Sequence, residues 1–569
     1  MSGSSSRRER GSGLGEGNLW AWLAARMLRW GHPRSPLRRT IILVSLVVLW
    51  AVLSIVGWNG WEPGEGRIQS GQASDLPYLA LWLLTPQGDV WGEMPIALDL
   101  ARYLGAAIPL LGIIFLAARQ IGDALCESLM QAAGADHLIV IGEGRDAAQA
   151  AEVARSEGAA VVLIDPSIAE PQAEDLNQLG VLVIRDDLRA STKKSALRRA
   201  RRVVVVGPDA TTNLSLAGRA AHEMDPDASD LHVQIEDEDI LEKLRQSAAA
   251  HTGPGPAPRP FSLAAAAARL ANETLKLWDR SGGLHVACLG LGPFSQSMAR
   301  QALTLGWRVG RPPPKVTFWD PTGDLEDRWR RIAPGALGDL GPVYDSPPFS
   351  IVFSRAASVG AFLDETSAAD CWVVESDVGV ACAASLLAAR LDVSPMVVVA
   401  GEQPLDAIMP GVHTAVSGFA AGLEPAILPA VDRRAQRLHG AYESRGRDGY
   451  IELGSDASGV RWSILPESLW AANRAAAAHI PVKLADADAA GADPRDDRAL
   501  LERMAELEHE RWCAERLLNG WRPGERDNRR KLHPGLAGWQ YLDEPTRQKD
   551  RDGVIDAFRV ARPRENSRL

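Results

Sequence analysis

The sequence predicts three kinds of domain: an α-helical membrane domain with two spans and a re-entrant loop, two α/β domains in tandem, and an α-helical C-terminal domain. Residues 41–58 carry no charge, and 18 residues of helix approach the thickness of a bilayer core, about 30 Å. Two later segments share one pattern, in which an apolar strand, a glycine-rich turn and a helix follow one another. A chain of 569 residues has room for roughly three or four such domains.

Composition excludes some functions. The formal net charge is −10, whereas phosphate neutralisation requires Lys and Arg concentrated on one domain, so nucleic acid is not a predicted main partner. The five cysteines are scattered without CxxC spacing, which predicts buried thiols in a reducing compartment and no metal site: Cys126, Cys288, Cys371, Cys382 and Cys513.

Residues 1–40 form the first segment, which we expect to be disordered except for an interfacial helix over residues 19–30. Eight arginines precede residue 41, whereas acidic residues gather between residues 62 and 93. The positive-inside rule then places both termini in the cytoplasm, with the chain in the inner membrane. A cleavable signal peptide is the alternative for residues 41–58, but about 40 residues precede that run and no small-residue cleavage site follows it.

Residues 41–120 are predicted to form the membrane domain, with a second span over residues 95–118. Between the spans, residues 75–89 contain a short apolar run and a polar loop, as expected of a re-entrant pore helix, because irregular backbone at membrane depth must line a water-filled cavity. The loop lacks the TVGYG pattern of potassium filters, so potassium selectivity is not predicted. The predicted pore residues, whose acids would attract cations, are Thr85, Gln87, Gly88, Asp89 and Glu93.

Residues 121–250 are predicted to form the first α/β domain. The strand at residues 138–141 leads into Gly142-x-Gly144-x-x-Ala147, and a second strand ends at Asp165. In a dinucleotide-binding Rossmann unit, the first glycine permits a tight turn, the second admits a phosphate and the small third residue allows close helix packing. In such a unit, an acidic residue at the end of the second strand binds the ribose hydroxyls, and Asp165 has this position. A turn kept for packing alone is the alternative, and an oxidoreductase is disfavoured because no proton-transfer side chain stands out.

The continuation, residues 179–224, resembles the regulator-of-potassium-conductance (RCK) or TrkA-N family. The resemblance rests on Arg185-Asp186-Asp187 after one strand and on Asp209 and Asn213 after the strand at residues 203–206. It implies Rossmann-like domains that form a tetrameric gating ring beneath a membrane pore, with NAD or another adenine nucleotide as ligand. The candidate nucleotide-binding residues are Gly142, Gly144, Arg145, Ala147, Asp165, Asp186, Asp209 and Asn213.

Residues 262–430 repeat the design after a Pro/Gly-rich linker at residues 251–262. Gly290-x-Gly292-x-x-Ser295 follows a buried strand, and the next strand, residues 315–319, ends at Asp320. Three further strands complete a doubly wound pattern, and Gly290, Gly292, Ser295 and Asp320 are its candidate nucleotide-binding residues. This copy departs further from the fingerprint, so a structural role is slightly favoured over nucleotide binding.

Residues 434–565 contain the C-terminal domain, which resembles the ryanodine-receptor repeat, the RyR domain. The resemblance rests on residues 508–512, Asn519-Gly520-Trp521 and residues 531–534. His509-Glu510 lacks the second histidine of a zinc-protease motif, since Cys513 stands at that spacing. A ligand pocket of aromatic rings and guanidinium groups is one interpretation, and core tryptophans with surface ion pairs are the other. The candidate pocket residues are His509, Arg511, Trp512, Trp521, Arg526, Lys531 and His533.

These features together predict a nucleotide-gated channel that conducts cations, without enzymatic activity. Its partners would be the lipid bilayer, further copies of the chain in a tetramer and a small nucleotide. The alternatives are a membrane-anchored nucleotide sensor or a phage-defence membrane effector without selective conduction, and an oxidoreductase.

Overall fold

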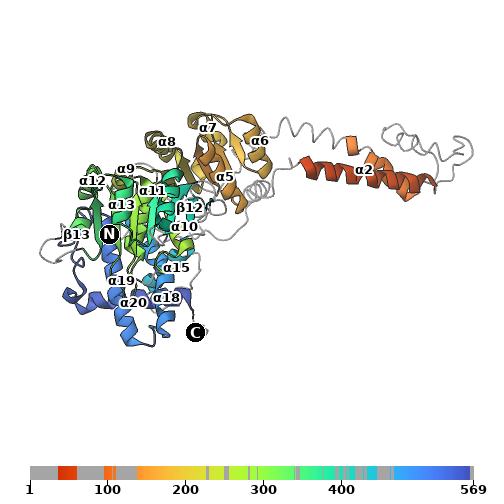
Figure 1. The fold of residues 1–569 in the computed structure, drawn as a ribbon. Helices are drawn as coiled ribbons and strands as arrows, with labels where there is room; N and C mark the ends of the chain where they lie inside the picture. The colour runs from red at the N-terminus through yellow and green to blue at the C-terminus, as the bar shows by residue number, and fades with distance from the viewer. Residues whose placement is uncertain are drawn as a thin grey trace, which may run out of the picture. The chain divides into compact units, whose positions relative to one another are not determined.

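A computed structural model describes most of the α/β and C-terminal regions and parts of the N-terminal region (Figure 1). The chain divides into two compact units, residues 1–139 with 158–200 and residues 140–157 with 201–569. The described residues are 36–59, 95–105, 107–109, 137–225, 230–248, 256–279, 282–290, 292–338, 340, 347–375, 377–390, 396–401, 405, 409, 411–416, 427, 432–444, 462, 465 and 467–563.

Helix α2 (Pro36–Asn59) contains the first predicted span, and residues 96–105 of the second are also helical. Within the ranges just given, no helix combines the length and the apolar character needed to cross a membrane. The two-span prediction is therefore not confirmed. The predicted loop at residues 75–89 lies outside the described residues, and so do the predicted pore residues Thr85, Gln87, Gly88, Asp89 and Glu93.

The first sheet has six strands in the order β3-β2-β1-β4-β5-β6, the doubly wound order of mononucleotide-binding folds. Its first four strands in chain order are short and largely apolar, as expected when helices cover both faces of a sheet. The strands are β1 (Leu138–Gly142), β2 (Val161–Ile164), β3 (Leu182–Ile184), β4 (Arg202–Val206), β5 (Asp230–Gln234) and β6 (Pro258–Phe261). The helices are α5 (Arg145–Ser156), α6 (Glu170–Leu179), α7 (Leu188–Lys194), α8 (Ala210–Glu223) and α9 (Glu238–Ala248).

Strand β6 was not predicted, because its sequence was interpreted as linker. It pairs in parallel with β5 and ends the sheet. An edge strand tolerates proline because one side of its backbone has no neighbouring strand to which an N–H group must donate a hydrogen bond. The first α/β domain therefore extends beyond its predicted end at residue 250.

The second sheet repeats the order of the first, β12-β11-β10-β7-β8-β9, and all its pairs are parallel. Its strands are β7 (His285–Leu289), β8 (Lys315–Trp319), β9 (Ser350–Ser354), β10 (Cys371–Val374), β11 (Met396–Gly401) and β12 (Val412–Val416). The helices are α10 (Leu263–Leu275), α11 (Pro293–Leu305), α12 (Asp324–Ile332), α13 (Val359–Glu365) and α14 (Val378–Arg390). Both predicted Rossmann-like sheets are thus confirmed.

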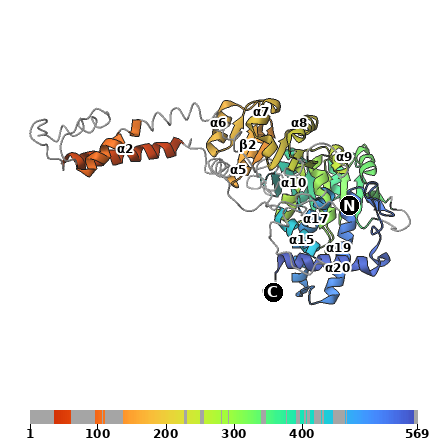
Figure 2. The ribbon, with the colours of Figure 1, turned by 180° about the vertical axis from the view of Figure 1, so that it is seen from behind.

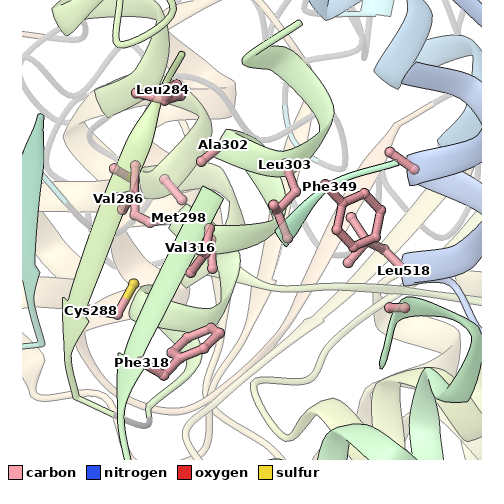
Figure 3. Packing of buried hydrophobic residues seen from close by; sticks show 14 of the residues in the cluster. Leu284, Val286, Cys288, Met298, Ala302, Leu303, Val316, Phe318, Phe349 and Leu518 are labelled. Atoms are coloured by element: carbon pink, nitrogen blue, oxygen red, sulfur yellow. The ribbon is translucent and has the colours of Figure 1, made fainter. Parts of the chain in front are cut away.

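The C-terminal helices gather beside the second sheet (Figure 2). They are α15 (Arg433–Ser444), α17 (Glu467–Ala478), α18 (Ile480–Ala490), α19 (Arg498–Leu518) and α20 (Glu544–Ala561). Leu517, Leu518 and Trp521 belong to the same hydrophobic cluster as Phe318 and Trp329 of the second α/β domain. Figure 3 shows Leu518 with the Phe349 side chain of this cluster. One core therefore serves both domains.

Candidate nucleotide sites

The first glycine turn joins β1 to α5 and brings β1 close to β4. A Cβ atom on Gly142 would lie 1.9 Å from the Val206 carbonyl oxygen, so only glycine fits there. Gly144 is the N-cap of α5 with φ of +84°, a backbone region that favours glycine. A Cβ atom on Gly144 would meet nothing within 4 Å, so the space beyond this turn is open. Ala147 is fully buried, and its Cβ would lie 3.4 Å from a Cβ atom added to Gly142.

The other candidate residues of the first α/β domain lie at separate positions: Arg145 in α5, Asp165 after β2 and Asp186 after β3. Asp165 follows β2 and is fully buried, and its Oδ1 accepts 2.8 Å hydrogen bonds from the Ser167 amide and hydroxyl. Arg145 is exposed in the first turn of α5. Asp186 forms an ion pair with Lys194, at 2.7 Å.

The loop after β4 is held by amide side chains. Asn213 Nδ2 donates to the carbonyl oxygens of Gly207 and Gln234, at 2.7 and 3.0 Å. The Gly207 amide donates to Gln234 Oε1, at 3.2 Å, and Asp209 caps α8 by accepting from the Thr212 amide. Asp209 and Asn213 thus shape the backbone at the end of β4. Gln234 was not among the residues predicted for this site, because it lies on the next strand, β5, and not in the loop after β4.

The second glycine turn, between β7 and α11, is occupied by a carboxylate of the chain itself. Glu375 follows β10 and accepts hydrogen bonds from the Phe294 amide at 3.0 Å, the Ser295 amide at 2.9 Å and the Ser295 hydroxyl at 2.7 Å. A Cβ atom on Gly292 would lie 2.5 Å from Glu375 Cδ, and one on Gly290 would lie 3.0 Å from Glu375 Cβ. The two candidate glycines and Ser295 therefore accommodate Glu375.

Asp320, the candidate ribose-binding acid of the second domain, is also engaged. It is fully buried, and its carboxylate accepts from the amides of Gly323 and Glu326 at 3.1 and 3.0 Å. Arg355 Nη1 donates to the same carboxylate at 3.2 Å and to the Asp320 carbonyl oxygen. Asp320 therefore fixes the start of α12.

A buried charge network lies inside the C-terminal domain. Glu508 accepts from Lys483 Nζ at 2.6 Å and from Arg511 through Nε at 3.0 Å and Nη2 at 2.9 Å. Burial raises the pKa of Glu508, but Arg511 and Lys483 outweigh it and hold the pKa well below its ordinary value. His479 donates to the Trp307 carbonyl oxygen and accepts from Lys483, which requires the neutral ring, and burial lowers its pKa accordingly.

His509 lies between two acceptors. Its Nδ1 is 3.2 Å from an Asp550 carboxylate oxygen, and its Nε2 is 2.8 Å from the Ala537 carbonyl oxygen. Both ring nitrogens therefore donate, and the ring is an imidazolium. Burial disfavours this cation, but hydrogen bonds with Asp550 and Cys513 raise the pKa of His509 to about 11.

The remaining candidate pocket residues pack or pair within the domain. Trp512 and Trp521 flank His533, with ring centroids 5.0 and 6.3 Å from it, and Trp521 is buried in the shared core. Burial, with Arg526 nearby, lowers the pKa of His533 to about 4. Lys531 Nζ donates to the Asn519 carbonyl oxygen at 2.7 Å.

A pocket of about 130 Å³ does open in the C-terminal domain, at another place. It is lined by Leu438, Tyr442, Asn473, Ala476, Lys483, Glu508, Gly553 and Ala557, and by none of the seven candidate pocket residues. Among the residues that the structure describes, no group of three or more His, Cys, Asp or Glu side chains is placed to hold a metal ion.

Comparison with known proteins supports the C-terminal assignment. Residues 494–562 match the family model of the RyR domain, which confirms the predicted resemblance over that range. No curated protein sequence matches the chain.

Among solved structures, the chain is similar to GsuK bound to ADP, with 14% identity, a TM-score of 0.32 and coverage of 70% of this chain and 96% of that one. It is also similar to the GsuK channel bound to NAD, with 12% identity, a TM-score of 0.31 and coverage of 74% and 84%. A third is the A chain of dipicolinate synthase from Bacillus subtilis, with 11% identity, a TM-score of 0.20 and coverage of 52% and 93%.

Proposed function

We propose that the first Rossmann domain binds an adenine nucleotide such as NAD or ADP at the N-terminus of α5. The observation that carries this proposal is the turn at Gly142 and Gly144, which brings the backbone tightly past β4 and leaves open space beyond Gly144. Backbone N–H groups at a helix N-terminus attract phosphate, and a glycine there lets it approach. The site lies between the ends of β1 and β4, where the strand order reverses and ligands of doubly wound sheets bind.

The experiment compares two glycines at opposite ends of α5. Gly144 and Gly158 have φ of +84° and +89°, and neither has an atom within 4 Å of an added Cβ, so Gly144→Val and Gly158→Val impose similar backbone strain. Calorimetric titration of the purified chain with NAD and ADP should show saturable binding that Gly144→Val abolishes and Gly158→Val retains. Equal effects of the two variants would remove the assignment.

The bound nucleotide acts as a signal in this proposal, and the chain is not an enzyme. The polar side chains around the end of β4 support this, because Asn213 and Gln234 are amides engaged with backbone groups and neither transfers protons near neutral pH. Incubation with NAD and analysis of the recovered nucleotide tests it, and turnover without added partner would favour the oxidoreductase.

We further propose that the chain is a tetrameric channel of the inner membrane, opened or closed by that nucleotide. Helix α2 supports a membrane location, because the charge-free run extends along it and Val44, Val48 and Val56 are 54%, 56% and 56% exposed. Nucleotide binding would change channel opening only by its different affinity for the two states. Flux of cations from liposomes that contain the purified chain, with and without NAD or ADP, is the test. Liposome association without flux would favour the membrane-anchored sensor.

A further inference from the structure

We propose that Glu375 closes the second Rossmann domain to nucleotides, because its carboxylate takes the position of a bound phosphate at the N-terminus of α11. This inference goes beyond the nucleotide site proposed for the first domain and concerns a different set of residues.

The carboxylate makes the contacts that a phosphate makes in a glycine turn. Its two oxygens accept from two consecutive backbone amides, those of Phe294 and Ser295, and from the Ser295 hydroxyl, all within 3.0 Å. The positive end of the helix dipole favours a negative charge at this place, and the hydrogen bonds to an ionised acceptor are of the strong kind. The anion that this helix attracts is thus already supplied by the chain.

The glycines of the second turn fit this interpretation. An added Cβ on Gly292 would lie 2.5 Å from both Cδ and Oε1 of Glu375. In a nucleotide-binding turn, this glycine makes room for a phosphate. In the second domain it makes room for the Glu375 side chain. A phosphate entering this turn would compete with Glu375 for the same donors and meet a like charge.

The first domain shows what the same fold looks like without this side chain. Both sheets have the same strand order, so the residue after the fourth strand has the same place in each sheet. That residue is Gly207 after β4 and Glu375 after β10. The first domain therefore has no carboxylate at the position from which Glu375 reaches the second glycine turn.

Hydrogen exchange of the full-length chain gives the first test. With saturating NAD or ADP, we expect protection of the amides of residues 142–147 and unchanged exchange of residues 292–298. Protection of residues 292–298 in the wild-type chain would overturn the inference. Absence of protection at residues 142–147 would bear on the proposed function of the first domain alone.

The second test replaces Glu375 in order to free the second glycine turn for an anion. Glu375→Gly introduces the residue that the first domain has, and Glu375→Gln keeps the shape while it removes the charge. In a Gly144→Val background, which silences the first site, we expect inorganic pyrophosphate to bind once per chain to Glu375→Gly and not to Glu375→Gln or to the parent. Pyrophosphate is the probe because it requires only the anion site.

Thermal unfolding of each variant, with and without pyrophosphate, separates a folding defect from a binding result. A Glu375→Gly chain that folds and gains no binding overturns the inference. If Glu375→Gly does not fold, Glu375→Ser replaces it with a smaller loss of local structure, and the wild-type exchange experiment still decides the question.

Discussion

Glu508→Gln is expected to destabilise the C-terminal domain by about 3–5 kcal/mol, the usual cost of removing one partner of a buried ion pair. Glu508 accepts three hydrogen bonds from Lys483 and Arg511, and those two residues are each only 2% exposed. The glutamine side chain has the same shape, but it leaves both cations without their hydrogen-bonded counter-charge and directs an amide donor toward groups that also donate. The loss therefore arises from charge and not from a cavity.

The matched control is Glu502→Gln. Glu502 pairs with Arg551 at 2.8 Å, but its side chain is 37% exposed, so its loss should cost about 0–1 kcal/mol. Urea unfolding followed by tryptophan fluorescence measures both variants, with the transition midpoint and slope fitted for each. Adding Lys483→Met to Glu508→Gln should recover part of the loss because one uncompensated cation is removed. A difference between Glu508→Gln and Glu502→Gln below about 1 kcal/mol would refute the reasoning.

Three further outcomes follow from the geometry. The pKa of His509 is raised from 6.5 to about 11, so the stability gained from its cation is full below pH 6.5 and is lost as the pH rises toward 11. Unfolding midpoints measured across a pH series should show this decline, and His509→Gln should flatten it. Gly142→Ala should destabilise the chain by about 1–3 kcal/mol or more in urea unfolding, since its Cβ would lie 1.9 Å from a carbonyl oxygen of β4. Trp521→Ala should cost about 3–5 kcal/mol as a core residue, whereas exposed Arg526→Ala should stay within about 0.5 kcal/mol by the same assay.

Local sequence patterns predicted most strands of both sheets, because a run of Val, Ile and Leu between turns identifies a buried parallel strand without knowledge of its neighbours. Strand β6 has the sequence PRPF, which carries no such signal. It is a strand because β5 offers an open edge, and that edge is a property of the assembled sheet. Strands β5 and β12 were likewise missing from the sequence-based pattern. Strand β12 pairs with β11 at the other sheet's edge.

The candidate sites show the same difference between local sequence signals and groups that only the assembled fold brings together. The glycine turns were found because their residues are adjacent in sequence and the constraints on Gly142 and Gly144 are local. Glu375 lies 80 residues from Ser295, so nothing near the second turn indicates which group its helix N-terminus binds. The useful signal would have been an acidic residue directly after the fourth strand of a doubly wound pattern.

The tryptophans of the C-terminal domain illustrate a further limit. Their spacing beside arginines is compatible with an exposed ligand pocket or with a core, and the choice depends on what covers them. Trp521 is covered because α19 packs against α11 and the segment around Gly335 of the second α/β domain. The core interpretation of Trp521 follows from this contact between domains.

The filled glycine turn and the shared core have a common consequence for the second Rossmann domain. Arg300 of α11 donates to the Leu518 carbonyl oxygen at the end of α19, at 2.7 Å, and lies 3.8 Å from the Glu238 carboxylate at the start of α9. One side chain thus contacts the second domain, the RyR-like domain and a helix of the first sheet. A close-packed core transmits strain because it has little room to absorb it. The second domain, in which Glu375 occupies the glycine turn, is therefore a packed connection between α9 and α19.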